Sequence, residues 1–330
     1  MAAIIETKDL TKVYHGGVKA VDNLNIQIEK GEIYSFLGPN GAGKTTTINM
    51  LTTRISPTSG TASVGGFDIR KDSYKIRRII GVVPQDLTTD EDLSGYENLM
   101  MVSQFYDIRR QEASEKIGEL LRLVDLTDAS RRLVRTYSGG MRKRLELIAG
   151  LVHEPEILFL DEPTLGLDVQ TRTQMWNYVR DIQERVGITI ILTSHYLEEV
   201  DALSQRISII DHGKVLVTDT SRNLKSSLKG DTVSLTFGSR EDVDTMMKFT
   251  IANEIKDAGD NTVRIRIENS DSSLPEIMRF MTERGLIATR MTVTKPTLDE
   301  VFMEYTGKYI REAESTDGKK MMFNLRRLRN

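Results

Sequence analysis

One nine-residue segment constrains the fold of this chain more than any other. Residues 38–46 read GPNGAGKTT and match G-x-x-x-x-G-K-[ST], the pattern of a phosphate-binding loop that joins a strand to a helix. The apolar run EIYSFL precedes the loop, and the helix-forming sequence TINML follows it. Glycines let backbone N–H groups curve around a phosphate, and the positive end of the next helix faces the anion. We therefore expect a strand–loop–helix unit that binds nucleotide phosphates.

The side chains of this loop have separate expected roles. Lys44 should reach the β- and γ-phosphates, and the Thr45 hydroxyl should ligate Mg²⁺. The alternative, a glycine-rich turn without a ligand, is disfavoured by the flanking strand and helix. The predicted phosphate-contacting residues are Gly38, Pro39, Asn40, Gly41, Ala42, Gly43, Lys44, Thr45 and Thr46.

Two acidic residues follow another apolar run, EILFL. Asp161 and Glu162 would lie at the carboxyl end of a buried strand, which is where open α/β sheets bind ligands. Asp161 can hold Mg²⁺ through water, and Glu162 can polarise an attacking water molecule. An ordinary acidic strand end before Pro163 is the alternative, and the phosphate loop disfavours it.

A serine and two glycines open a second predicted helix in the sequence YSGGMRKRLELIAGL. Ser138 is a plausible N-cap, and Gly139 and Gly140 expose backbone N–H groups at the helix start. These residues predict a second anion-binding helix terminus, and a simple capped helix is the alternative.

The order of these three motifs resembles that of ABC-type ATPases, over residues 4 to about 220. By this resemblance Tyr14 stacks on adenine and Gln85, in GVVPQD, senses Mg²⁺ and water. Asp168 is similar to the D-loop aspartate, and His195, in TSHYLEEV, to the switch histidine that contacts the γ-phosphate. The chain departs from the usual family motifs at two places. It has YSGGM where LSGGQ is commoner, and LGLD where the family usually has SALD.

The resemblance implies a complete set of site residues. ATP would lie between two copies of the chain, or between this chain and a second ABC ATPase, with the phosphate loop of one facing Ser138, Gly139 and Gly140 of the other. Hydrolysis would then open the dimer. The implied catalytic residues are Glu162, His195, Lys44 and Gln85; the implied Mg²⁺ ligands are Thr45, Gln85 and Asp161.

A motif near the C-terminus, KPTLDEVFMEYTG (295–307), is similar to one in drug-resistance ABC ATPases of the daunorubicin-exporter group. That resemblance implies a separate multi-span permease and a place at the inner, cytoplasmic face of the cell membrane, with no nucleic-acid partner. A soluble ABC ATPase acting on ribosomes or DNA and an importer ATPase are the alternatives. The single nucleotide-binding domain and the absence of sustained heptads argue against the soluble types.

The predicted fold class is α/β: an ABC-type P-loop domain with an antiparallel β subdomain, followed by a small α+β domain. The first domain spans residues 1–220, with a helical subdomain inserted at about 94–150. Residues 221–307 predict the order β-α-β-β-α-β of a ferredoxin-like domain. The basic tail at 308–330 predicts either a solvated end or an amphipathic helix on a membrane surface.

Composition excludes several other classes of protein. Lys and Arg number 45 against 48 Asp and Glu, a net charge of -3 that gives no general attraction to nucleic acid. The absence of cysteine removes disulfides and thiolate sites, and four scattered histidines argue against a multi-histidine metal site. The longest stretch without a charged residue is 13 residues, 55–67, too short for a membrane-spanning helix.

Overall fold

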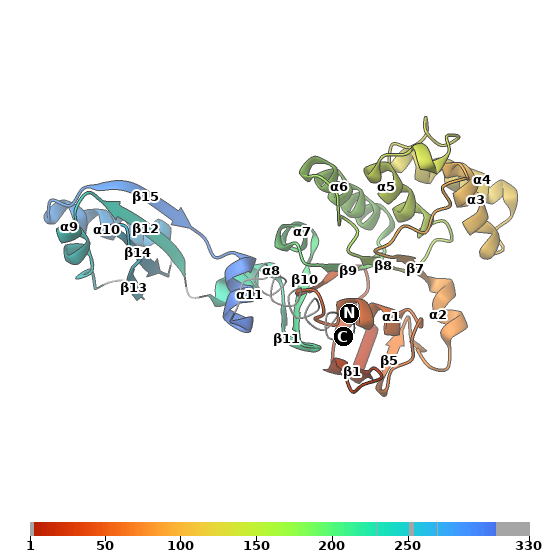
Figure 1. Cartoon of the computed structure of the whole chain (residues 1–330), viewed down its shortest axis with the longest axis horizontal. Helices are drawn as coiled ribbons and strands as arrows, with labels where there is room; N and C mark the ends of the chain where they lie inside the picture. The colour runs from red at the N-terminus through yellow and green to blue at the C-terminus, as the bar shows by residue number, and fades with distance from the viewer. Residues whose placement is uncertain (1–2, 229, 251–253, 269, 308–330) are drawn as a thin grey trace, which may run out of the picture. The chain divides into compact units, whose positions relative to one another are not determined.

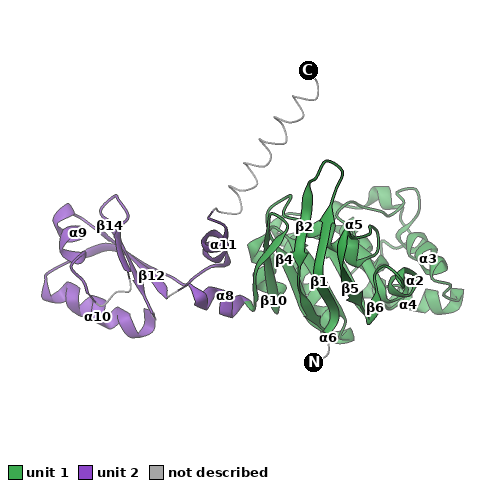
Figure 2. Cartoon of the chain, turned by 90° about the horizontal axis from the view of Figure 1, so that it is seen from below, with its two compact units in different colours: residues 1–220, 310–330 green, residues 221–309 purple. Residues whose placement is uncertain are grey.

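The computed structural model describes residues 3–228, 230–250, 254–268 and 270–307 (Figure 1). The chain forms two compact units, within residues 1–220 and 221–309 (Figure 2). The basic tail at 308–330 lies outside the described residues. No helix in the described ranges is long and apolar enough to cross a membrane.

A six-stranded sheet organises the first unit, in the order β11-β10-β4-β9-β8-β7. Five neighbouring strands are parallel, and β11 pairs with β10 in the antiparallel direction. The strands are β4 (Ile33–Leu37), β7 (Ile80–Val83), β8 (Ile157–Asp161), β9 (Thr189–Ser194), β10 (Arg206–Asp211) and β11 (Lys214–Asp219). The apolar runs EIYSFL and EILFL are confirmed as the strands β4 and β8. Their carboxyl ends share one edge of the sheet, where the phosphate loop and the acidic pair follow β4 and β8.

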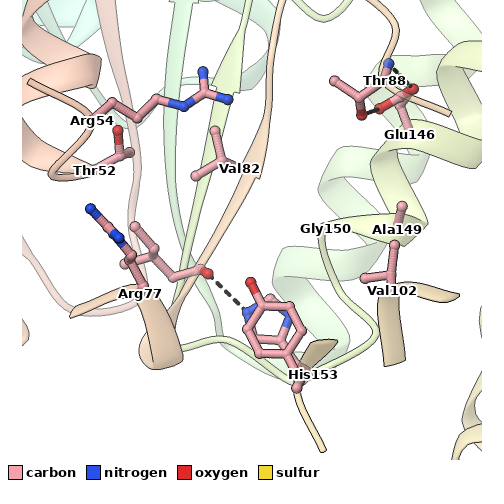
Figure 3. A pocket seen from close by; sticks show the side chains of 12 residues that line it. Thr52, Arg54, Arg77, Val82, Thr88, Val102, Glu146, Ala149, Gly150 and His153 are labelled. Atoms are coloured by element: carbon pink, nitrogen blue, oxygen red, sulfur yellow. Dashed lines mark hydrogen bonds between the residues drawn. The ribbon is translucent and has the colours of Figure 1, made fainter. Parts of the chain in front are cut away.

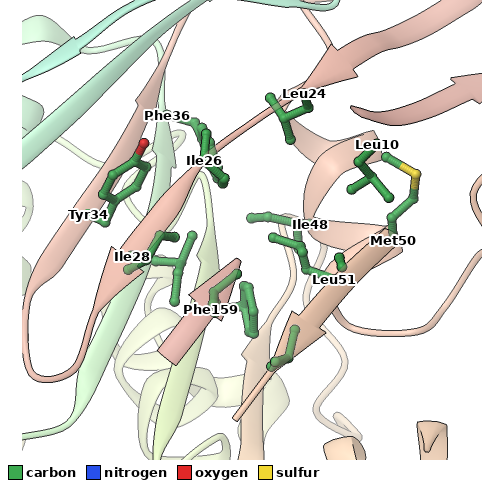
Figure 4. Packing of buried hydrophobic residues seen from close by; sticks show 14 of the residues in the cluster. Leu10, Leu24, Ile26, Ile28, Tyr34, Phe36, Ile48, Met50, Leu51 and Phe159 are labelled. Atoms are coloured by element: carbon green, nitrogen blue, oxygen red, sulfur yellow. The ribbon is translucent and has the colours of Figure 1, made fainter. Parts of the chain in front are cut away.

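An antiparallel sheet packs beside the parallel one. Its strands are β1 (Ala3–Val13), β2 (Lys19–Leu24), β3 (Gln27–Glu29), β5 (Ser59–Val64) and β6 (Phe67–Asp68). The predicted antiparallel β subdomain is confirmed, since every strand pair of this sheet is antiparallel. Leu10 and Ile28 from this sheet join Phe36 and Phe159 from the parallel sheet in one buried cluster (Figure 4). Ile48 of α1 (Lys44–Leu51) lies in the same cluster, which anchors the helix that follows the phosphate loop.

A helical block interrupts the α/β pattern, as predicted. Its elements are α3 (Gly95–Phe105), α4 (Arg110–Leu123), the short 3-10 helix η1 (Val134–Thr136) and α5 (Gly139–Ala149). Leu99, Ile117 and Leu145 come from three different helices and pack in its buried centre. The remaining helices of this unit are α2 (Ser73–Ile79), α6 (Val169–Val186) and α7 (Leu197–Leu203).

The second unit contains the predicted β-α-β-β-α-β order. Its sheet runs β13-β14-β12-β15 with every neighbouring pair antiparallel, which is the ferredoxin-like arrangement. The strands are β12 (Asp231–Phe237), β13 (Glu254–Asp257), β14 (Thr262–Ile267) and β15 (Ala288–Thr294), and the helices are α8 (Ser221–Ser227), α9 (Arg240–Met246), α10 (Ser270–Glu283) and α11 (Leu298–Thr306). Helix α11 lies within the drug-resistance-type motif, and its Val301 and Phe302 are buried.

Candidate nucleotide-binding site

The phosphate loop connects the end of β4 to the start of α1 and is packed closely against its own unit. Gly43 has φ 106°, and a Cβ atom there would lie 2.3 Å from the carbonyl oxygen of Ala20. At Gly38 a Cβ atom would lie 2.2 Å from the carbonyl oxygen of Ile210. Both positions therefore exclude side chains, which explains why the motif requires glycine there. Ala42 is buried beneath the loop, and its carbonyl accepts a hydrogen bond from the Gly213 N–H.

Lys44 is buried inside this loop, with 4% of its surface exposed. Its Nζ donates hydrogen bonds to the carbonyl oxygens of Gly38 at 2.6 Å and Pro39 at 3.0 Å. The same Nζ lies 3.7 Å from Glu162 Oε1. A buried ammonium is stable only with such partners, so the loop carbonyls and one carboxylate hold the charge at the base of the cleft.

Asp161 meets two hydroxyl groups at the end of β8. Thr45 Oγ1 donates to Asp161 Oδ1 at 3.2 Å, and Thr193 Oγ1 donates to the same oxygen at 2.5 Å. Thr193 also accepts from the Glu162 N–H, through its hydroxyl at 3.1 Å and its carbonyl at 3.2 Å. Thr193 thus positions both acids, and the sequence analysis missed it. The available signal was a hydroxyl residue at the end of the apolar run ITIIL.

Glu162 and His195 face each other from the ends of two neighbouring strands. His195 Nδ1 lies 3.3 Å from Glu162 Oε2, and both side chains are largely buried. Burial alone would raise the pKa of Glu162, but the adjacent His195 and Lys44 outweigh it and lower that pKa below its usual value. Glu162 also has φ 50°, a strained conformation for a residue other than glycine. The site therefore holds an ionised carboxylate in a fixed position.

These groups open into a cleft of ≈ 610 Å³. Its lining residues are Tyr14, Val18, Ala20, Asn40, Gly41, Gly43, Lys44, Thr45, Thr46, Gln85, Glu162, Leu165 and His195. Tyr14 and Gln85, far from the loop in sequence, thus reach the same cleft. Tyr14 is 42% exposed and leaves a ring face available to a planar base. Val18, Ala20 and Leu165 were not predicted, because nothing in their sequence context separates them from ordinary apolar positions.

The remaining predicted residues lie away from the cleft lining. Ser138 is an exposed N-cap of α5, and its hydroxyl accepts from the Met141 N–H at 3.3 Å. Asp168 caps α6, and its carboxylate accepts from the N–H and the hydroxyl of Thr171 at 3.0 and 2.7 Å. These bonds lower the pKa of Asp168. A Cβ atom on Gly140 would lie 2.5 Å from Thr171 Cγ2, so the two helix starts are neighbours. We call residues 138–140 the signature tip.

The residues around Asp161 fit a magnesium ion. Thr45 Oγ1 and Asp161 Oδ1 are hard oxygen donors 3.2 Å apart beside the phosphate loop, and Mg²⁺ binds through few protein oxygens plus water and nucleotide phosphates. The amide of Gln85, which also lines the cleft, would be a further oxygen donor.

Two family models match this chain. The ABC transporter model matches residues 21–165, and the model for the C-terminal domain of DrrA1-3-like ATP-binding proteins matches residues 220–306. The first contains the phosphate loop, the signature tip and the acidic pair; the second covers the ferredoxin-like unit.

Relatives match over almost the whole chain. The daunorubicin resistance ATP-binding protein DrrA3 of Streptomyces coeruleorubidus is 36% identical over 96% of this chain and 100% of its own length. The daunorubicin/doxorubicin resistance ATP-binding protein DrrA of Streptomyces peucetius is 39% identical over 92% of each chain. The linearmycin resistance ATP-binding protein LnrL of Bacillus subtilis (strain 168) is 33% identical over 94% of this chain and 100% of its own.

Solved structures of ATP-binding cassettes share the fold of the first unit. The dimeric, post-hydrolysis structure of the cassette MJ0796 bound to ADP and Pi has a TM-score of 0.60 and 26% identity, covering 66% of this chain and 98% of that one. The structure of CbiO1 from Clostridium perfringens, part of the ABC transporter complex CbiONQ, has a TM-score of 0.63 and 26% identity, covering 68% and 91%.

Proposed function

This chain belongs to the ABC transporter family of ATP-binding proteins, and on that premise we propose that it is the ATP-hydrolysing subunit of an exporter. The observation that carries the proposal is the buried group of Lys44, Asp161 and Glu162 at the edge of one cleft, in a chain whose full-length relatives are named for drug resistance. The energy released by hydrolysis would drive a separate membrane permease.

Binding of ATP uses the loop and the aromatic wall of the cleft. The loop N–H groups and the start of α1 surround the β-phosphate, and Lys44 moves its hydrogen bonds from the loop carbonyls to the β- and γ-phosphates. Tyr14 stacks on the adenine ring. Asn40, Gly41 and Thr46 complete the phosphate wall.

Hydrolysis needs a base aimed at the γ-phosphate. Glu162 is ionised and held at the cleft, so it can accept a proton from the attacking water. His195, 3.3 Å from that carboxylate, contacts the γ-phosphate from the neighbouring strand end. Thr45, Asp161 and Gln85 would hold Mg²⁺, which supplies charge neutralisation for the phosphates when bound.

The site is completed by a second ABC chain, either another copy of this one or a different ATPase. The signature tip is exposed and outside the cleft of its own chain, although it presents backbone N–H groups at a helix start. In a two-fold dimer each tip would bind the γ-phosphate held by the other chain, with Asp168 beside it. Closure on ATP excludes water, and hydrolysis releases the two chains.

The permease would carry the choice of cargo. Relatives of this chain are named for resistance to daunorubicin, doxorubicin and linearmycin, so the proposed cargo class is a drug-like compound. To drive a membrane permease, the chain would work at the inner face of the cell membrane.

Affinity purification from gently solubilised native membranes, followed by mass spectrometry, tests this role. A multi-span permease should copurify in near-equal amount. Recovery only with ribosomal or DNA-bound proteins would contradict the transporter role and leave the ATPase activity standing.

A further inference from the structure

Glu199 is a buried acid to which the proposed reaction gives no role. Four carboxylate side chains are buried among the described residues: Glu146, Asp161, Glu162 and Glu199. Two of them follow β8 at the ATP cleft. Both oxygens of Glu146 accept hydrogen bonds from Thr88 beside a separate cavity of ≈ 320 Å³ (Figure 3). Glu199 lines neither this cavity nor the ATP cleft, so its burial needs another explanation.

The Glu199 carboxyl group accepts hydrogen bonds from two other elements of the fold. Its Oε1 accepts from the Thr164 hydroxyl at 2.8 Å and from Trp176 Nε1–H of α6 at 3.1 Å. Thr164 and Glu199 are both fully buried. Among the described residues, Glu199 is the only hydrogen-bond partner of the Thr164 hydroxyl. Loss of the carboxyl group would therefore leave a buried donor unpaired, which is costly.

Thr164 belongs to the turn that carries Glu162. The Leu165 N–H donates to the carbonyl oxygen of Glu162 at 3.2 Å, which closes a tight turn directly after β8. Glu162 has φ 50°, and a residue other than glycine keeps such a strained conformation only where its surroundings hold it. Thr193 holds the start of the turn by accepting from the Glu162 N–H. The hydrogen bond from Thr164 to Glu199 holds the rest of the turn.

Glu199 is also close to the segment that carries His195. It lies in the first turn of α7, the helix that begins two residues after this histidine. The hydroxyl of Ser194, directly before His195, lies beside the Glu199 carboxyl group. This segment has a further contact, because the guanidinium of Arg172 stacks over the Tyr196 ring at 4.1 Å. We therefore expect loss of the carboxyl group to displace the turn after β8 more than the histidine.

A role in stability alone does not account for an acid at this position. Burial raises the pKa of Glu199, so its ionised form lowers folding stability near neutral pH. A leucine of similar bulk would fill the space without burying a carboxyl group, and such replacements are often neutral or stabilising. What the leucine lacks is an acceptor for the Thr164 hydroxyl.

We propose that Glu199 is a positioning residue for ATP hydrolysis, and that it acts through Thr164 to hold the Glu162 carboxylate at the γ-phosphate. This inference rests on the proposed function, in which Glu162 is the base. Without the acceptor, the strained turn can relax and the base moves away from the attacking water. The phosphate loop and Tyr14 would still bind ATP. The loss should therefore appear in kcat and not in the Kd for ATP.

The test removes each end of the hydrogen bond separately and then both ends together. Glu199→Leu removes the acceptor, and Thr164→Val removes the donor with almost no change in shape. Steady-state phosphate release gives kcat, a fluorescent ATP analogue gives the Kd, and urea unfolding gives the stability of each variant. Each single variant should lower kcat about 10–100-fold and keep the Kd within about 3-fold. The double variant should lose no more than the larger single loss, because both changes remove the same bond.

Two further variants separate positioning from stability. Trp176→Phe removes the other donor to the same Glu199 oxygen, so it should lower stability and keep kcat within about 3-fold. Glu199→Gln keeps an oxygen that can accept from Thr164, so its kcat should return to within about 3-fold of the unaltered chain. If Glu199→Leu fails to fold, Thr164→Val and Glu199→Gln still test the inference.

Three results would overturn the inference and leave the proposed function intact. The first is a folded Thr164→Val chain with the normal kcat. The second is an equal loss of kcat in Trp176→Phe, which would mean that general destabilisation slows turnover. The third is losses that add fully in the double variant. Absence of ATP hydrolysis by the unaltered chain would instead contradict the proposed function.

Discussion

Lys44 and Glu162 are buried among partners from their own chain, whereas Ser138 and Gly139 lie exposed at the start of α5. The first group has a carbonyl, hydroxyl or charged neighbour for each functional atom within 3.7 Å. Within the part of the chain that the structure describes, the second group has only the bonds of its own helix start. On the proposed function, the difference means that the folded chain builds one half of an ATP site from its own residues and would offer the other half to a second chain. Substitutions in the two groups should therefore fail in different ways.

The largest expected effect is from Glu162→Gln in the buried group. The amide keeps the shape of the side chain but cannot accept the proton from water, so turnover should fall about 10²–10⁴-fold while ATP still binds. Steady-state phosphate release and a fluorescent nucleotide measure the two quantities. The matched control is Glu156→Gln, an exposed acid just before β8 that pairs with Lys30 and should leave turnover unchanged. Unchanged turnover in Glu162→Gln would falsify its role as the base.

Lys44→Ala should also act within one chain, and it should weaken ATP binding as well as turnover. Removing the ammonium leaves the phosphates without their buried counter-charge, so kcat/KM should fall about 10²–10³-fold and the Kd for ATP should rise. Lys30→Ala, an exposed lysine outside the cleft, is the control. A Lys44→Ala chain that binds ATP with the normal Kd would show that the phosphates lie elsewhere.

Ser138→Ala should distinguish the role of the exposed signature tip from that of the buried residues of the cleft. Loss of the N-cap costs about 1 kcal/mol of folding stability, and turnover should fall several-fold because the tip serves another chain. The Kd for ATP in dilute, monomeric samples should stay the same. Ser239→Ala removes the comparable cap of α9 in the second unit and should cost similar stability without lowering turnover. A changed monomer Kd in Ser138→Ala would place the tip in its own chain's site.

The smallest expected effect is on the pH dependence of folding stability, in which two buried carboxylates act in opposite directions. Burial raises the pKa of Glu199 above its ordinary value of 4.5, although Thr164 and Trp176 donate to its Oε1 at 2.8 and 3.1 Å. The folded chain should thus lose stability as pH rises from 4.5 through the folded pKa of Glu199. Glu162 has a lowered pKa, so its effect on stability runs the other way. The stabilisation that its carboxylate contributes is present above pH 4.5 and is lost as pH falls through its folded pKa.

Glu199→Gln removes the titration of Glu199. Its amide oxygen can still accept the hydrogen bonds from Thr164 and Trp176. Urea unfolding midpoints between pH 4 and 8 should then fall less on going to high pH than those of the unaltered chain. Parallel pH curves for the two chains would mean that burial does not perturb Glu199.

Much of the fold and of the candidate site could be predicted from the amino-acid sequence. The glycines of the loop and the buried strands β4 and β8 follow from steric and periodic rules that act locally. Lys143, Glu146 and Thr193 were missed for a common reason. A lysine and a glutamate on an amphipathic helix are typical of a solvated face, and a threonine at a strand end is an ordinary residue. Their contacts form only when the chain between β7 and α3 and the end of β8 come beside them in the fold.

The measurement that tests the central claim most directly is the mass of the Glu162→Gln chain by light scattering. With saturating Mg·ATP, and no other protein present, the mass should double from 37.3 kDa, and the added substitution Ser138→Arg should keep it at the single-chain value. A single-chain mass with ATP bound, or doubling that survives Ser138→Arg, would contradict an ATP site completed by the signature tip of a second copy.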